Sequence, residues 1–248
     1  MDGIILINKE KNYTSHDVVN KIKKITKSKV GHTGTLDPNA TGVLPLLLGN
    51  ATKISKYLIN HDKEYEVVLQ LGIKTDTADV EGKIIEEREV NTDSLNEENV
   101  KEVLNTFIGK QKQTPPMYSA IKVNGKKLYE YARKGQEVEI KPREIEIYEI
   151  KITNLDKDKK QISFTVKCSK GTYIRSLCED IAEKLGTVGF MKELNRTIVG
   201  NFNIKDSVTI SEFEEKYNNN DFSDVITIEK IFKENPKIEL NNQNLKQY

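Results

Sequence analysis

Several stretches of the chain have the hydrophobic pattern of β-strands. Residues 3–8 are a short apolar run, and residues 64–72 alternate so that Tyr65 and three aliphatic side chains share one face. Residues 144–152 and 161–169 are two further strand-like segments joined by a polar connection. The sequence therefore predicts a sheet, with the Tyr65 ring on the apolar face of one strand.

Four other stretches predict helices. One begins at Thr14, where Asp17 three residues later completes a capping pair and apolar residues then recur on one face. Residues 51–60 predict a short helix, residues 94–107 a longer one, and residues 172–186 a helix that ends at a glycine. No internal repeat or low-complexity linker divides these elements, and 248 residues leave room for one large domain or two small ones.

Charge is segregated along the chain although the net charge is only +1. Residues 1–60 carry nine lysines against four acids, residues 61–108 carry five basic residues against thirteen acids, and residues 109–143 carry nine against three. Phosphate binding responds to local potential rather than to the sum, so this composition is compatible with a polyanionic partner. Simple solvation of lysine-rich faces is the alternative explanation.

The composition argues against several classes of protein. No run reaches the roughly eighteen apolar residues of a membrane span, and the N-terminal segment lacks a basic stretch followed by a long apolar one. We therefore expect a cytoplasmic protein without a membrane partner. Cys168 and Cys178 form no CxxC motif and are expected to be reduced core residues. His16, His32 and His61 are too scattered to predict a metal site.

The segment VGHTGTLDPNATGVLP, residues 30–45, holds a single acid among three glycines and two prolines. Pro38 disfavours the α conformation for the preceding residue, so Asp37 is biased to an extended backbone. The glycines allow positive φ angles or the close approach of another backbone. Such a loop is suited to present the Asp37 carboxylate, although an ordinary Asp-Pro turn has the same pattern.

Familiar site motifs do not explain this loop. The chain contains neither GxxxxGK[ST] nor GxGxxG after a strand, and it has no GxSxG motif. His32 and Gly34 match the start of the HxGH signature of nucleotidylyltransferases, but Thr35 stands where the second histidine belongs. That activity is therefore a minor alternative.

Four long blocks carry a family resemblance in the correct order: GHTGTLDPNATGVLPLLLGNATKISKYL, KEYEVVLQLGIKTDTADVEG, PPMYSAIKVNGKKLYEYARKG and CSKGTYIRSLCEDIAEKLG. Together they closely resemble the TruB family of tRNA pseudouridine synthases, which convert uridine 55 in the T loop of tRNA to pseudouridine. The resemblance spans residues 3–202. It implies an α+β (mixed α/β) fold with a largely antiparallel central sheet, surrounding helices and an RNA-binding cleft.

The resemblance also implies a domain organisation and partners. Residues 1–235 are expected to form the catalytic domain, and residues 236–248 a polar tail that is at most the start of a C-terminal PUA-like module. The expected partner is the T stem-loop of tRNA, with no obligatory protein partner, and the protein is expected to be a monomer. The reaction breaks the N1–C1′ bond and joins C5 to C1′ without a redox change, so no cofactor and no metal are expected.

Matched residue by residue, the resemblance assigns an active site. Asp37 matches the catalytic aspartate, Tyr65 the tyrosine that packs on the target base, and Arg175 the arginine that pairs with the catalytic carboxylate. A core aromatic and a helix-surface ion pair are the alternative roles of Tyr65 and Arg175. The remaining substrate-side positions match Leu194, His32, Lys9 and Lys53.

RNA binding and chemistry leave several hypotheses open. The target base must be flipped out, at a cost of roughly a few kcal/mol. Basic residues interleaved with Tyr118, Tyr129 and Tyr131 are candidates for the contacts that offset this cost. The sequence leaves three chemical routes open: attack by Asp37 at C1′, attack by Asp37 at uracil C6, and a glycal route.

Two other functions are also open. The protein could be a tRNA-folding chaperone, as an additional or sole function, or a guide-RNA-dependent synthase that needs partner proteins.

Three positions depart from the family pattern. Glu10 replaces a proline and Asn12 a glycine in the N-terminal segment KEKNYTS. We expect Asn12 to preserve a left-handed turn and the loss of the proline to loosen Lys9. Asn195 stands where the family often has an arginine, which puts one phosphate or structural contact in question.

Overall fold

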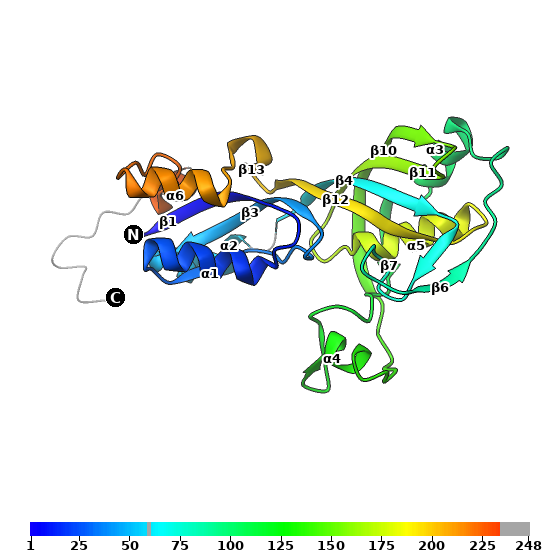
Figure 1. Ribbon diagram of the computed structural model, residues 1–248, viewed down its shortest axis with the longest axis horizontal. Coiled ribbons are helices and arrows are strands. Elements are labelled where there is room, and N and C mark those ends of the chain that lie inside the picture. The colour runs from blue at the N-terminus through cyan, green and yellow to red at the C-terminus, as the bar shows by residue number, and fades with distance from the viewer. Residues whose placement is uncertain (59–60, 234–248) are drawn as a thin grey trace.

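The structure of the protein, a computed structural model, describes residues 1–58 and 61–233 (Figure 1). The polar tail expected at residues 236–248 lies outside the described residues, as does the end of the helix expected at residues 51–60.

Within the described residues, nine strands form one sheet in the order β1-β3-β12-β4-β11-β10-β7, with β2 paired to β3 and β13 paired to β12. Every pairing is antiparallel except the short parallel contact between β3 and β12. The predicted α+β fold with a largely antiparallel central sheet is therefore confirmed. The strands of this sheet are β1 (Gly3–Lys9), β2 (Val30–His32), β3 (Thr41–Leu48), β4 (Lys63–Leu71), β7 (Gly109–Gln113), β10 (Arg143–Asp156), β11 (Gln161–Cys168), β12 (Gly189–Val199) and β13 (Phe202–Asn203).

Two small hairpins lie outside the main sheet. One consists of β5 (Ile73–Thr75) and β6 (Ile84–Glu87), and the other of β8 (Lys122–Val123) and β9 (Lys126–Lys127). The second hairpin turns at Asn124 and Gly125, which both have positive φ angles, as the Asn-Gly pair favours. Together with the helix that follows, this hairpin projects from the body of the molecule (Figure 1).

The helices lie around the sheet, and the helices predicted from Thr14, at residues 94–107 and at residues 172–186 are confirmed with altered bounds. The helix predicted at residues 51–60 is described as far as residue 58, as a 3-10 turn followed by one short α-helix. The first helix begins where its capping pair predicts, because the Thr14 hydroxyl accepts from the Asp17 amide at 3.0 Å and the Asp17 carboxylate accepts from the Thr14 amide at 2.9 Å. The helices are α1 (Ser15–Thr26), the 3-10 turn η1 (Gly49–Ile54), α2 (Ser55–Leu58), α3 (Glu97–Asn105), α4 (Leu128–Ala132), α5 (Ile174–Lys184), the 3-10 turn η2 (Ile204–Asp206), α6 (Ile210–Asn218) and α7 (Ile228–Ile231).

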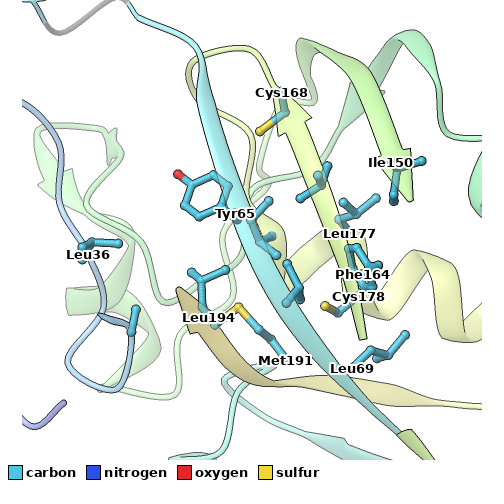
Figure 2. Packing of buried hydrophobic residues seen from close by; sticks show 14 of the residues in the cluster. Leu36, Tyr65, Leu69, Ile150, Phe164, Cys168, Leu177, Cys178, Met191 and Leu194 are labelled. Carbon is cyan, nitrogen blue, oxygen red and sulfur yellow. The ribbon is translucent and has the colours of Figure 1, made fainter. Parts of the chain in front are cut away.

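The core consists of two clusters, one on each side of β1. Ile5 and Ile7 belong to the larger cluster and Ile4 and Leu6 to the smaller one, as expected for a strand buried on both faces. The larger cluster continues along β4 and β11, where Tyr65 shares the apolar face with the aliphatic residues of β4 (Figure 2). The face predicted for Tyr65 is therefore confirmed.

The hydrophobic pattern does not predict the two central strands β3 and β12. β3 is buried along nearly its whole length, so it has no alternation, and it contains Pro45. β12 has two register shifts against β4, which interrupt its period. Where β12 runs beside β3, Gly42 has a φ of +111°, and a Cβ there would lie 2.2 Å from the Arg196 carbonyl oxygen. Only glycine permits this close approach of the two backbones.

Candidate active site

A cavity of about 720 Å³ lies where the loop between β2 and β3 meets β4, β12 and the N-terminal end of α5. The segment that leads into the β8–β9 hairpin closes another side. These segments are far apart in sequence, and the sheet order brings them together. The residues that line the cavity include Asp37, Tyr65, Tyr118, Arg175, Leu194 and Arg196.

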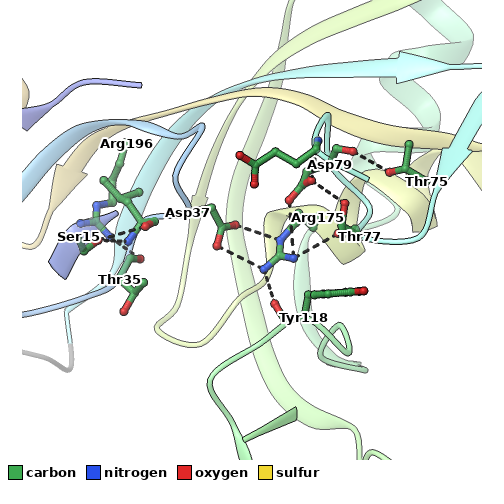
Figure 3. A network of polar contacts seen from close by, with 11 residues as sticks. Ser15, Thr35, Asp37, Thr75, Thr77, Asp79, Tyr118, Arg175 and Arg196 are labelled. Carbon is green, nitrogen blue, oxygen red and sulfur yellow. Dashed lines mark hydrogen bonds and ion pairs between the residues drawn. The ribbon is translucent and has the colours of Figure 1, made fainter. Parts of the chain in front are cut away.

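Asp37 and Arg175 form a two-pronged ion pair inside this cavity (Figure 3). Arg175 Nε lies 3.0 Å from Asp37 Oδ2, and Nη2 lies 3.4 Å from Oδ1. The Arg175 side chain is 7% exposed and the Asp37 side chain 35%, so the carboxylate keeps an open side. Paired contacts of this kind fix the orientation of a carboxylate as well as its position.

The protein holds Arg175 through backbone contacts from two other loops. The guanidinium donates to the carbonyl oxygens of Tyr118, at 2.9 Å, and Thr77, at 3.2 Å. A second carboxylate, that of Asp79, lies 3.9 Å from Nη1. Asp37 and Asp79 therefore face the same cation from different loops (Figure 3).

The electrostatic surroundings make Asp37 more basic than an ordinary aspartate. Burial raises the pKa of Asp37, and the charge of Asp79 raises it further, while the positive charges of Arg175 and Lys9 act in the opposite direction. A carboxylate with a raised pKa is a stronger base once ionised. The Arg175 contact then holds the ionised group in one orientation.

The backbone on both sides of Asp37 is anchored to neighbouring elements. The Ser15 hydroxyl, at the start of α1, accepts from the Leu36 amide at 2.8 Å and donates to the Leu36 carbonyl at 3.1 Å. On the other side, the Pro38 carbonyl accepts from the Asn12 amide at 3.0 Å. Asn12 has a φ of 68°, so the expected left-handed turn is confirmed.

Lys9 is fully buried beneath this loop. Its ammonium group donates to the carbonyl oxygens of Tyr13 at 2.7 Å, Glu10 at 2.9 Å and Pro38 at 3.0 Å. The expectation that the loss of a proline would loosen Lys9 is therefore wrong, because three carbonyls hold the ammonium group. Burial lowers the pKa of Lys9 to about 8. The geometry places Lys9 as an anchor of the loop rather than on the open side of the cavity.

Tyr65 and Leu194 lie on the paired strands β4 and β12 and both line the cavity. The Tyr65 side chain belongs to the core, but its hydroxyl end reaches toward the loop that holds Leu36 (Figure 2). Burial raises the pKa of Tyr65 to about 12. The cavity thus brings together Asp37, Arg175, Tyr65 and Leu194.

The structure places the other two predicted site residues away from the cavity lining. His32 is half-buried in β2, where burial and the charge of Arg196 lower its pKa. Lys53 is exposed on η1. Asn195, where the family often has an arginine, is tied to Glu66 at 2.9 Å and to Thr41 at 3.1 Å.

The basic segment with interleaved tyrosines forms the projecting lobe around β8, β9 and α4 (Figure 1). Tyr118 and Tyr129 line the cavity from this side. Lys127 and Arg133 each lie 5.3 Å from the centre of the Tyr129 ring. The Tyr131 hydroxyl, on α4, donates to the Val123 carbonyl of β8 at 3.2 Å. The lobe and the segment that leads into it therefore bring two tyrosines to the cavity, with two cations beside one of the rings.

The sequence does not indicate that two charged residues, Asp79 and Arg196, belong to the site. Asp79 lies in the TDTADVEG stretch, whose polar character is that of an ordinary turn. Arg196 lies in β12, which has no clear strand pattern, and a single arginine there suggests an exposed position. Only the packing shows that both side chains are buried.

No group of three or more His, Cys, Asp or Glu side chains within the described residues is placed to hold a metal ion. Burial raises the pKa of the Cys168 thiol to about 12 and also raises that of Cys178, and both are free cysteines. No helix in residues 1–58 or 61–233 is long and apolar enough to cross a membrane.

The fold is similar to that of chains in solved complexes. A chain in the crystal structure of a Cbf5-Nop10-Gar1 complex superposes with a TM-score of 0.68 at 31% identity, over 87% of this chain and 54% of that one. A chain in an H/ACA RNP bound to a substrate RNA containing 2′-deoxyuridine gives a TM-score of 0.64 at 27% identity, over 96% of this chain and 56% of that one. This chain thus spans about half of those solved chains and has the fold of pseudouridine synthases.

The sequence comparisons then define the family. The model of the TruB family pseudouridylate synthase N-terminal domain matches residues 21–174, and that of the tRNA pseudouridylate synthase B C-terminal domain matches residues 175–232. tRNA pseudouridine synthase B of Oceanobacillus iheyensis is 50% identical over 88% of this chain and 72% of its own length. That of Clostridium kluyveri is 46% identical over 99% and 83%. The chain belongs to the TruB family of tRNA pseudouridine synthases.

Proposed function

We propose that the protein isomerises uridine 55 in the T loop of tRNA to pseudouridine, with Asp37 as the catalytic carboxylate. The observation that carries the proposal is the Asp37–Arg175 pair, at 3.0 Å, on the wall of a cavity of about 720 Å³. The cavity is large enough for a nucleotide, and Asp37 is oriented within it. The catalytic unit is proposed to be residues 1–235.

The target uridine reaches Asp37 by flipping out of the folded RNA. A stacked or paired base cannot enter a protein cavity, and its extrusion costs roughly a few kcal/mol. Contacts by the basic lobe and stacking on Tyr129 would offset this cost. Tyr65 and Leu194 would then enclose the uracil ring, since the two side chains supply an aromatic and an aliphatic surface beside Asp37.

The proposed chemistry needs only groups that the cavity holds. Breaking the N1–C1′ bond and joining C5 to C1′ involves no redox change, so an ionised carboxylate and a base to accept the C5 proton are sufficient. Arg175 favours the ionised form of Asp37 and fixes its orientation, while burial and Asp79 raise the pKa of Asp37 and so increase its basicity.

The proposal is tested by tritium release from tRNA labelled at uridine C5. We expect the wild-type protein to release tritium from T-loop uridine without added cofactor or partner protein, and Asp37→Asn to release none above background. Asp62→Asn is a matched control, because Asp62 is an acid outside the cavity lining. Full turnover by Asp37→Asn would refute the catalytic role, and release from a different uridine would refute the assignment of position 55.

The same variants separate two alternatives. A tRNA-folding chaperone function should survive Asp37→Asn, and native gel analysis of tRNA folding with the variant measures it. A guide-RNA-dependent synthase would require partner proteins, as the solved structures of Cbf5 complexes illustrate for those proteins. Activity of the isolated chain on bare tRNA would exclude that requirement.

A further inference from the structure

Arg196 is a buried cation on β12. The residue is 1% exposed, and among residues 1–58 and 61–233 no carboxylate lies within the 4.0 Å of an ion pair with its guanidinium. Burial lowers the pKa of Arg196. A buried charge without a partner lowers the stability of the folded protein. The contacts that Arg196 makes instead of an ion pair are therefore of interest.

Backbone carbonyls replace the missing acid. Arg196 Nε donates to the Val43 carbonyl on β3 at 3.0 Å, and Nη2 donates to the Gly34 carbonyl at 3.1 Å. A longer contact of 3.5 Å joins Nη1 to the Thr35 carbonyl. Gly34 and Thr35 belong to the loop that leads to Asp37, so this guanidinium fastens the loop to the sheet (Figure 3).

The same guanidinium faces Tyr65. Tyr65 and Arg196 are directly opposite in the antiparallel pairing of β4 with β12, so their side chains lie on one face. Both residues line the cavity, and the positive charge of Arg196 acts to lower the pKa of the Tyr65 phenol, against the effect of burial. The Cys168 thiol and the Asp37 carboxylate act in the opposite direction and raise the pKa of Tyr65. Lys63 is another ionisable group that lines the same cavity.

The two buried arginines of the site therefore have separate partners. Arg175 contacts the Asp37 carboxylate, whereas Arg196 lies directly opposite Tyr65 in the pairing of β4 with β12. Arg196 thus offsets part of the burial that disfavours negative charge on the Tyr65 oxygen.

We propose that Arg196 is the positioning residue of Tyr65: from the directly opposite place on β12, its charge stabilises negative charge on the phenol oxygen where both residues line the cavity. The inference rests on the proposed function, because it matters for catalysis only if the Tyr65 hydroxyl meets the substrate. It predicts that the charge of residue 196 governs the rate of the chemical step, beyond its role in fastening the loop.

Two variants of Arg196 separate charge from hydrogen bonding. Arg196→Lys keeps the charge, whereas Arg196→Gln keeps donors for the backbone carbonyls but loses the charge. The Tyr65 titration is followed by ¹⁹F NMR of protein labelled with 3-fluorotyrosine, and Tyr65→Phe assigns the resonance. The single-turnover rate is measured by tritium release, and the affinity for tRNA by filter binding. Arg88→Gln, at an exposed arginine, is the matched control.

A neighbouring charge shifts a pKa by about 1 to 3 units, so Arg196→Gln should raise the Tyr65 pKa by at least about one unit and lower the single-turnover rate at least about tenfold. Arg196→Lys should stay much closer to wild type in both, and the affinity for tRNA should change little in either variant. Equal losses of rate in the two variants, with the Tyr65 titration unchanged, would overturn the proposal and leave Arg196 as a structural clamp.

Two further outcomes are decisive. If Arg196→Gln does not fold, Arg196→Lys is measured with and without Tyr65→Phe. A rate loss that shrinks in the Tyr65→Phe background supports action through Tyr65, and an equal loss in both backgrounds refutes it. If the wild-type protein releases no tritium, the proposed function fails, while the NMR titrations still test the relation between Arg196 and Tyr65.

Discussion

Ser15→Ala tests how strongly the N-terminal end of α1 holds the loop that carries Asp37. Ser15 is 2% exposed, and its hydroxyl makes two hydrogen bonds to Leu36, at 2.8 Å with the amide and 3.1 Å with the carbonyl. Loss of one typical hydrogen bond costs about 1 kcal/mol, and a buried amide left without a partner costs about 1 to 3 kcal/mol. We expect the free energy of unfolding to fall by about 2 to 4 kcal/mol.

For a chain of this size, about 1 kcal/mol shifts Tm by about 2 to 4 °C, so Ser15→Ala should lower Tm by about 4 to 16 °C. Differential scanning calorimetry measures this shift, and tritium release should show a lower kcat because the residue before Asp37 loses its anchor. Ser211→Ala is the matched control, an exposed serine near the start of α6. A Tm within about 1 °C of wild type for Ser15→Ala would refute the reasoning.

Two further predictions concern pH. The charge of Asp79 raises the pKa of Asp37, and in the proposed function the ionised form of Asp37 is the active one. Asp79→Asn should therefore move the acid limb of kcat/KM to lower pH, and an unchanged midpoint in the pH profile would contradict this. Lys9 has a folded pKa of about 8 against an ordinary 10.5, so the folded state binds fewer protons between these values. Urea denaturation should therefore show wild type gaining stability over Lys9→Met from pH 8 to 10.5, by at most about 3 kcal/mol; a constant difference would contradict it.

Local patterns predict much of the fold because several elements are specified within a few residues of sequence. The Thr14 and Asp17 capping pair fixes the start of α1, and the alternation of β4 fixes the face of Tyr65. The hydrophobic pattern does not predict β3, because this strand is buried on both faces, nor β12, because register shifts interrupt its alternation. Their parallel contact depends on Gly42, whose role is apparent only when the opposing backbone is in place.

The resemblance predicts the central members of the site, and the structure brings Asp37, Tyr65, Arg175 and Leu194 to one cavity. Their catalytic roles remain predictions. What the sequence does not reveal is the environment of each charge, because burial is set by elements distant along the chain. Lys9 is the clearest case: the resemblance places it among the substrate-side positions, whereas in the structure its ammonium group donates to three backbone carbonyls.

The loop around Asp37 is short of other charges because its backbone, rather than its side chains, supplies the anchoring groups. The carbonyls of Gly34, Leu36 and Pro38 accept hydrogen bonds from side chains of β12, α1 and β1, respectively. Two of these donors are cations, so an additional acid in the loop would compete with the carbonyls for them and with Asp37 for Arg175. A single carboxylate, with its cation provided by α5, avoids both competitions. The composition of the loop thus follows from the way it is held.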